Sequence, residues 1–195
     1  MSLPRPSSLA VESGEFSHDE RILLLRLAHE AIVSTLEHRE IPLDPPTEHF
    51  AEPRGAFTSL YLRGELRGCV GYVLAVSPVY RAVVETARAA AFEDTRFYPV
   101  TREEANDLEV ELSILSLPQP ISADAVEIGR HGLLISMAGH RGLLLPQVPV
   151  EHNWDRVTFL EQTCRKAGLP LDAWKHGAAV EAFTAEVFGE KSGNG

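Results

Sequence analysis

The sequence predicts an α+β protein with a mainly antiparallel or mixed sheet flanked by helices. Helix and strand patterns are interspersed along the chain, and several neighbouring strands are separated by turns short enough for hairpins. The composition is that of a globular protein, with 44% hydrophobic and 24% charged residues. A chain of 195 residues can bury one sizeable core without disulfide bonds or metal ions.

The first predicted element is a helix that begins at Ser17. Ser17 and Glu20 have the spacing of a capping box, and the apolar run ILLLRLAHEAIVSTL follows them. The helix is expected to end at residues 37–40, before a Pro-rich connection. Residues 1–16 and 189–195 are expected to be flexible tails, so the predicted domain spans residues 17–188.

A hairpin and a second helix are predicted next. The β-rich runs at 56–62 and 65–74 are joined at Arg63-Gly64, where glycine tolerates a positive φ. Ser77-Pro78 is expected to begin the following helix, with the serine as cap and the proline in the first turn. Apolar residues then recur at helical spacing, which indicates one buried helix face.

A short helix and a half-buried strand follow. Thr101 and Glu104 form a second capping box, and the run LEVELSIL at 108–115 alternates between apolar and polar residues. The alternation places Glu109 and Glu111 on the outward face. These two side chains could form a carboxylate pair for acid–base chemistry, but a plain solvent-facing surface is favoured.

The last part of the chain is predicted to contain three strands and one helix. Two short strands flank a turn at 138–142, and Asn153 or Asp155 caps the helix that follows. Cys164 lies on the apolar stripe of this helix and is expected to be a small packing residue. One last strand is expected at 179–188.

Charge, hydropathy and cysteine content disfavour several functional classes. The net charge of −10 opposes nucleic-acid binding. No apolar run reaches the roughly 18 to 20 residues of a membrane span, and no signal-peptide pattern is present, so a cytoplasmic protein without membrane contact is expected. The 2 cysteines are far apart and no Cys/His spacing indicates a zinc site, so neither a metal nor a cofactor is predicted.

Cys69 is the first candidate functional residue. It lies in LRGCVGY at 66–72, and in a regular strand it shares a face with Arg67 and Gly71. Arg67 could then stabilise a thiolate, which would suit a nucleophile or covalent carrier. In the alternative interpretation, Gly68 and Gly71 mark a bulge or a close backbone approach, and Cys69 is a small packing residue beneath a helix.

Other polar residues are candidates for the surroundings of Cys69. A nucleophile requires a base, and His131, His140 and His152 lie in loop-like stretches from which they could reach it. Asp94 and Arg96, in AFEDTRFYPV, either tie their own loop together or anchor a substrate. The residue types alone leave both interpretations of this pair open.

Five segments of the chain carry the order and spacing of a known set of sequence blocks. They are GELRGCVGYV, AAAFEDTRFYPVTREEANDLEVELSILS, GRHGLLI, GLLLPQVPVEHNWD and FLEQTCRKAGLP. Over roughly residues 18–188 the chain resembles the AMMECR domain family, whose prokaryotic members are called AmmeMemoRadiSam system protein A. The resemblance implies an α+β fold in which a larger portion packs against a smaller one and leaves a cleft between them.

The resemblance also implies which residues belong to this cleft. The family signature falls on residues 66–71, the Asp-x-Arg-Phe block on residues 94–97 and the Leu-Pro-Gln-Val block on residues 145–148. The candidate site residues are therefore Arg67, Gly68, Cys69, Gly71, Asp94, Arg96 and Gln147.

Prokaryotic members of the family are typically encoded with a Memo-like protein and a radical S-adenosylmethionine enzyme. The resemblance thus implies an accessory or adaptor protein of such a cytosolic system, with a small-molecule ligand as a further expected partner. The alternative is an enzyme that acts on a small molecule or a modification intermediate, with Cys69 as nucleophile or covalent carrier and Arg67 beside it.

Overall fold

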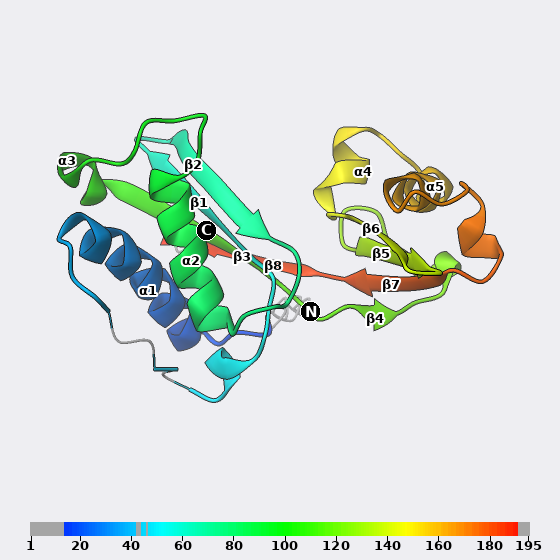
Figure 1. Cartoon of the computed structure of the whole chain (residues 1–195), viewed down its shortest axis with the longest axis horizontal. Coiled ribbons are helices and arrows are strands. Elements are labelled where there is room, and N and C mark those ends of the chain that lie inside the picture. The colour runs from blue at the N-terminus through cyan, green and yellow to red at the C-terminus, as the bar shows by residue number, and fades with distance from the viewer. Residues whose placement is uncertain (1–13, 42–43, 46, 191–195) are drawn as a thin grey trace, which may run out of the picture.

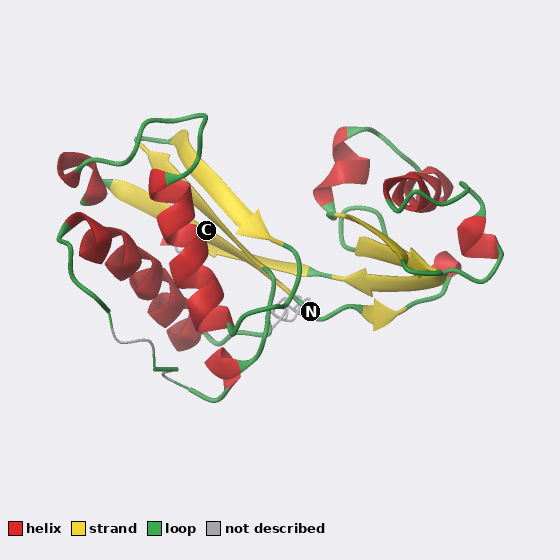
Figure 2. Ribbon diagram, viewed as in Figure 1, coloured by secondary structure: helices red, strands yellow, loops and turns green. Residues whose placement is uncertain are grey.

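The computed structural model describes residues 14–41, 44–45 and 47–190, and Figure 1 shows that they form two lobes. The predicted tails at 1–13 and 191–195 lie outside the described residues. Each lobe is built on a four-stranded antiparallel sheet, which confirms the α+β class (Figure 2). Within the described ranges, no helix is long and apolar enough to cross a lipid bilayer.

The larger lobe packs two long helices on one face of its sheet. Its elements are α1 (His18–Leu36), β1 (Ala56–Leu62), β2 (Glu65–Tyr72), α2 (Val79–Phe92), α3 (Arg102–Ala105), β3 (Leu108–Leu115) and β8 (Ala185–Gly189). The strand order is β2-β1-β3-β8. Apolar residues of α1 and α2 meet Leu60 and Leu112 in one continuous core, so the helices cover one face and leave the other toward the smaller lobe (Figure 1).

The local signals of the sequence account for most element boundaries in this lobe. The capping boxes at Ser17 and Thr101 are confirmed, and the hairpin turn has positive φ at both Arg63 (55°) and Gly64 (86°). The predicted cap at Ser77 is wrong. Pro78 has an extended backbone (φ −50°, ψ 144°), so it precedes the first turn of α2 instead of lying in it.

Residues 14–16 also contact the larger lobe, although they fall in the range predicted as a tail. Phe16 is buried, and its ring lies 6.4 Å from that of Phe50 and 6.3 Å from that of Phe188. Its N–H donates to the Glu186 carboxylate at 3.3 Å. The packed part of the larger lobe therefore begins before α1.

The smaller lobe has its own core. Its elements are β4 (Gln119–Pro120), β5 (Gly132–Met137), β6 (His140–Leu144), α4 (Gln147–Glu151), α5 (Arg156–Lys166) and β7 (Ala179–Phe183), with strand order β4-β7-β5-β6. Asp155 is the N-cap of α5, which settles the choice between Asn153 and Asp155. Cys164 on α5 is fully buried against Leu133 and Phe159, and this burial raises the pKa of its thiol. Its packing role is confirmed.

The two lobes are joined by two crossings of the chain. The chain leaves the larger lobe after β3 and returns between β7 and β8 (Figure 1). The single strand predicted at 179–188 is therefore wrong, because Thr184 interrupts it and its two halves lie in different sheets. At the crossing, Ser116 N–H donates to Thr184 O and Thr184 N–H donates to Ser116 Oγ, both at 2.9 Å. The described residues also form three short 3-10 helices, at His49–Ala51, Ala123–Ala125 and Ala173–Lys175.

Candidate functional site

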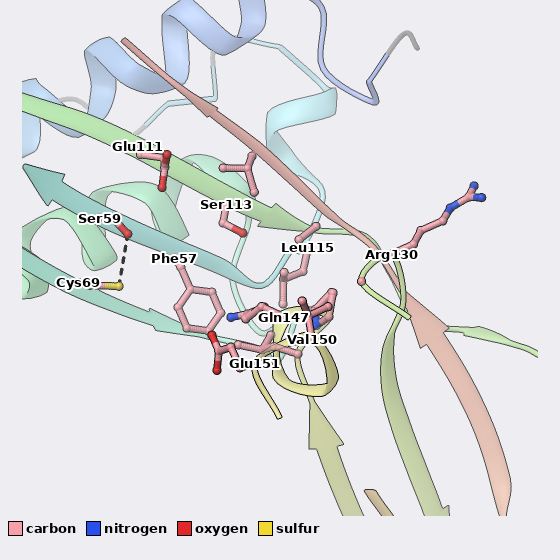
Figure 3. A pocket seen from close by; sticks show the side chains of 15 residues that line it. Phe57, Ser59, Cys69, Glu111, Ser113, Leu115, Arg130, Gln147, Val150 and Glu151 are labelled. Atoms are coloured by element: carbon pink, nitrogen blue, oxygen red, sulfur yellow. Dashed lines mark hydrogen bonds between the residues drawn. The ribbon is translucent and has the colours of Figure 1, made fainter. Parts of the chain in front are cut away.

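A cleft of about 590 Å³ lies between the open face of the larger sheet and the smaller lobe. The larger lobe supplies side chains from β1, β2, β3 and β8, and the smaller lobe supplies α4 and residues 129–130. Figure 3 shows Cys69 and Ser59 on one wall, with Gln147 and Glu151 reaching in from α4. The cleft therefore brings together residues that are far apart in the sequence.

Cys69 faces this cleft from the edge strand β2. It is opposite Ser59 of β1, and the Ser59 hydroxyl lies 3.4 Å from its Sγ atom (Figure 3). Its N–H donates to Asp94 and its carbonyl accepts from Arg96, so neither backbone group bonds to β1. Side chains are closer in such non-hydrogen-bonded pairs than in hydrogen-bonded ones, which explains the contact of hydroxyl and thiol.

Asp94 and Arg96 fix the backbone of Cys69. Asp94 Oδ2 accepts the Cys69 N–H at 2.9 Å, while Arg96 Nη2 donates to the Cys69 carbonyl at 3.2 Å and to Asp94 at 2.7 Å. The Arg96 guanidinium, followed by the Cys69 N–H, holds the pKa of Asp94 well below its ordinary value. The pair satisfies the outward-facing backbone groups of Cys69, as a further strand would.

Arg67 does not have the place that the regular-strand argument gave it. Gly68 pairs with Leu60 and Leu66 with Tyr61, so the register shifts at Arg67 and the alternation is broken. The Arg67 guanidinium binds Glu104 at 3.0 Å and also donates to the carbonyls of the 98–99 loop. It lowers the pKa of Glu104 and is not a lining residue of the cleft. The arginine in contact with Cys69 is Arg96.

Side chains added at the two glycines of the signature, Gly68 and Gly71, would project from opposite faces of β2. A Cβ atom on Gly68 would lie 2.1 Å from the carbonyl oxygen of Ala90 in α2, so Gly68 allows the helix to approach. Gly68 is not a lining residue of the cleft, and its geometry matches the alternative interpretation of a close backbone approach. A Cβ atom on Gly71 would lie 2.3 Å from the ring of Phe57, a cleft residue, so Gly71 makes room for that ring.

The histidines named as candidate bases are not lining residues of the cleft in the described part of the chain. His131 Nδ1 accepts the N–H of Glu127, and His152 stacks on Trp154 with ring centroids 4.7 Å apart. The ionisable groups that do line the cleft, besides Cys69, are Glu111, Arg130 and Glu151.

Comparison with known proteins identifies the family. The family model AMMECR1 matches residues 25–188. Protein MK0488 of Methanopyrus kandleri is 41% identical over 199 residues, covering 96% of this chain and 93% of that protein. A protein of Aquifex aeolicus is 41% identical over 178 residues, covering 86% and 91%. The chain belongs to the AMMECR1 family.

A solved structure agrees with this AMMECR1 assignment. The crystal structure of the uncharacterized protein PH0010 from Pyrococcus horikoshii is 39% identical to this chain. It covers 87% of this chain and 90% of its own, with a TM-score of 0.64. The likeness therefore spans both lobes of the fold.

In this AMMECR1 protein, the sequence blocks behind the resemblance supply different parts of the site. Cys69 and Gly71 are on the cleft face, Asp94 and Arg96 are behind Cys69, and Gln147 lines the cleft from α4. Sequence reasoning missed Phe57, Ser59, Ser113 and Glu151, and it assigned Glu111 to solvent. Alternation along β3 already placed Glu111 on the outward face, which was the available signal.

One further group of ionisable side chains lies outside the cleft. Glu15, His49 and Glu52 have ligand atoms within 4.8 Å of one another. The guanidinium of Arg54 donates to both Glu15 and Glu52, so an arginine already supplies the positive charge there. The arrangement is that of an ion-pair cluster.

Proposed function

We propose that the protein binds a small molecule in the cleft beside Cys69 and is an accessory protein of a Memo-like protein and a radical S-adenosylmethionine enzyme. The binding role is carried by one observation, a cavity of about 590 Å³ between the lobes with a thiol in its wall. Cavities of roughly 300 to 1,000 Å³ are usual for small-molecule sites. The accessory role rests on the family resemblance.

The lining of the cleft supports a small-molecule ligand. Its apolar side chains include Phe57, Leu115, Val150 and Val187, and its polar ones include Ser59 and Gln147. Val150 and Val187 are 53% and 57% exposed, so each presents apolar surface that a ligand would cover. Apolar walls with a few placed polar groups are typical of ligand sites.

The surroundings of the thiol favour binding over turnover. The hydrogen-bond partner of Cys69 Sγ is the Ser59 hydroxyl, which is a donor rather than a base. A nucleophilic cysteine requires an adjacent base, and no histidine lines the cleft within the described residues. Within the described residues, the thiol is thus hydrogen-bonded to a hydroxyl and not to a histidine, which supports a binding role.

Native mass spectrometry tests the binding role. The protein is incubated with the small-molecule fraction of a cell extract, and the mass of any retained compound is measured. Val187→Trp fills the cleft from β8, whereas Val157→Trp adds the same ring at a 42% exposed valine on α5, outside the cleft. We expect the wild type and Val157→Trp to retain the same compound and Val187→Trp to lose it.

Two outcomes would contradict this role. One is that no compound is retained by folded wild-type protein across extracts prepared under several growth conditions. The other is equal retention of the compound by Val187→Trp and the wild type. A compound that still binds when the cleft is filled must bind elsewhere.

The accessory role needs a separate test with purified partners. We expect a complex with a Memo-like protein or a radical S-adenosylmethionine enzyme from the same organism, measured by sedimentation at micromolar concentrations with the retained compound present. If the protein forms a complex with neither partner, the accessory role is rejected and the binding role is unaffected.

The alternative is a covalent role for Cys69, favoured by the position of its thiol on the cleft wall. A covalent carrier would keep its compound after denaturation, and Cys69→Ser would abolish the mass increase. A compound released by denaturation, and bound equally by Cys69→Ser, would show that the thiol is not bonded to it.

A further inference from the structure

We propose that the cleft selects a small amphipathic cation, such as a primary amine with an apolar body. This inference rests on the proposed function, because it names the class of ligand for the same cavity.

Among the described residues that line the cleft, the charged side chains without a salt bridge are carboxylates. Glu111 enters from β3 and Glu151 from α4, so the two carboxylates stand on opposite lobes. The Tyr61 hydroxyl donates a hydrogen bond to Glu111 Oε1 at 3.5 Å. Because this hydroxyl is neutral, it does not cancel the negative charge of Glu111. A cation in the cleft would therefore be attracted by carboxylates of both lobes.

The one arginine of the cleft lining, within the described residues, does not offset these carboxylates. Arg130 pairs with Glu127 at 3.2 Å, and its side chain is 64% exposed. Figure 3 shows its guanidinium directed away from Cys69 and from α4. Its charge is thus directed to solvent and to its own loop.

The arginines behind the cleft wall are also paired. Arg96 is held by Asp94 at 2.7 Å, and Arg67 by Glu104 at 3.0 Å. Each pair is close to electrically neutral as seen from a few ångströms away. Neither pair gives the cleft a positive potential that would favour an anionic ligand.

A neighbouring hollow shares one carboxylate with the cleft. A space of about 230 Å³ shares Glu111 with the cleft, and its lining also includes Glu109 and Glu190. Glu190 accepts the Val110 N–H at 2.9 Å and lies 2.8 Å from His29 Nε2. Glu190 is thus partnered, and the carboxylate that this hollow has in common with the cleft is Glu111; the net charge of −10 also favours cations over anions.

The remaining walls fit the apolar part of such a ligand. Phe57 and Leu115 form the wall of the larger lobe, and Val150 faces the cavity from α4 (Figure 3). An ammonium group has three donors, which suit the carboxylates, the serine hydroxyls and the Gln147 amide oxygen. A compact cation with an apolar chain satisfies both kinds of surface at once.

The reaction of Cys69 with charged methanethiosulfonates measures this selectivity. A cationic trimethylammonium-ethyl reagent, an anionic sulfonato-ethyl reagent and a neutral methyl reagent are compared in a Cys164→Ala background. In each case the Cys69 sulfur bonds to the reagent's sulfenyl sulfur and methanesulfinate leaves. The rate with the cationic reagent is divided by the rate with the anionic reagent, and this ratio is normalised to the same ratio for free 2-mercaptoethanol. We expect a normalised ratio of about ten, as a nearby unit charge at intermediate dielectric predicts.

Charge-neutralising variants locate the source of the ratio. Glu111→Gln and Glu151→Gln should each lower it by about threefold. Glu161→Gln on α5, outside the cleft, removes the same charge and should leave it near the wild-type value. A ratio at or below unity, or a ratio unchanged in both cleft variants, would overturn the inference. Failure of the neutral reagent to label folded protein would overturn the proposed function together with it.

Competition with matched probes tests the complete ligand class. Hexylamine and hexanoate have the same chain length and opposite charges. We expect millimolar hexylamine to slow labelling by the neutral reagent at least threefold more than hexanoate does, and Glu111→Gln to remove the difference. Equal or better protection by hexanoate would reject a cationic ligand while leaving the binding of small molecules in place.

Discussion

On its helix-covered face the larger sheet is closely packed, whereas on its cleft face the same strands leave space. Thr58, Leu60 and Leu112 on the helix side are 0% exposed. Their neighbours Ser59 and Ser113 on the cleft side are half-buried beside a cavity of about 590 Å³. The small side chains of Ser59 and Ser113 therefore leave space on this face, where a sandwich core would have larger apolar ones.

Strand β2 carries this contrast over two adjacent residues. Gly68 lets the backbone of α2 approach the sheet, and Cys69 turns its thiol to the cleft. The signature at residues 66–71 therefore has two roles, because Gly68 serves packing and Cys69 belongs to the site. Substitutions on the two faces should separate these roles, with stability affected on one side and thiol chemistry on the other.

The largest effect is expected from Gly68→Ala. The new Cβ atom would lie 2.1 Å from the Ala90 carbonyl oxygen, and backbone atoms of a helix cannot move aside without repacking it. We expect a loss of about 2 to 3 kcal/mol in the free energy of unfolding, measured by urea denaturation. Cys69→Ala, one residue away on the other face, is the control and should cost less than about 1 kcal/mol. Equal losses would remove the distinction between the faces.

The next effect concerns a buried pair of hydroxyls on the helix side. Thr58 Oγ1 and Thr86 Oγ1 are 2.8 Å apart, and Thr86 also donates to the Ala82 carbonyl at 2.8 Å. Thr86→Val leaves the Thr58 hydroxyl without this partner, so we expect a loss of about 1 to 2 kcal/mol in unfolding free energy. Thr58→Val leaves Thr86 bonded to α2 and should cost about half as much. The reverse order of the two losses would contradict the assigned roles.

Local sequence signals predicted most of the fold because they act within a few residues. The capping boxes at Ser17 and Thr101 and the alternation at 108–115 needed no tertiary information. The break at Thr184 could not be predicted, since threonine suits a strand and the β pattern is the same whether a strand stays in one sheet or crosses to another. Which sheet each half joins is decided by long-range pairing.

The site was predicted less completely for a related reason. Alternation placed Cys69 away from the more aliphatic face, and the flanking glycines suggested a bulge, but the position of the bulge at Arg67 is fixed only by the pairing of Gly68 with Leu60. Ser59 was missed because its contact with Cys69 depends on the register between β1 and β2. Register is set by tertiary packing as well as by the turn, so one strand alone does not reveal its opposite residues.

A smaller, pH-dependent effect is expected at the edge of β2. Asp94→Asn keeps an acceptor for the Cys69 N–H but removes the charge that Arg96 binds. Because the folded-state pKa of Asp94 is lowered, ionised Asp94 stabilises the fold above the ordinary pKa of about 3.9, and this contribution is lost as the pH falls below that value. The difference in urea midpoint between wild type and Asp94→Asn should therefore be greatest near pH 7 and shrink toward pH 3.

Asp107→Asn, which removes an exposed carboxyl from the same lobe, is the control for this experiment. It should change the urea midpoint at pH 7 by less than Asp94→Asn does. A difference between wild type and Asp94→Asn that grows as the pH falls would have the wrong sign for an aspartate stabilised by Arg96.

The smallest effect on stability is expected from Ser59→Ala on the cleft face. Sulfur is a weak acceptor, so losing the 3.4 Å contact to Cys69 Sγ should change the unfolding free energy by less than about 0.5 kcal/mol. The rate of Cys69 alkylation by iodoacetamide should nevertheless fall about twofold to fivefold, because the hydroxyl also donates to the thiolate that reacts. Ser113→Ala, from the same cleft on β3, is the control and should stay near the wild-type rate. A stability loss as large as that of Thr86→Val, with no change in alkylation, would mean that Ser59 serves packing and that the two faces differ less than their burial suggests.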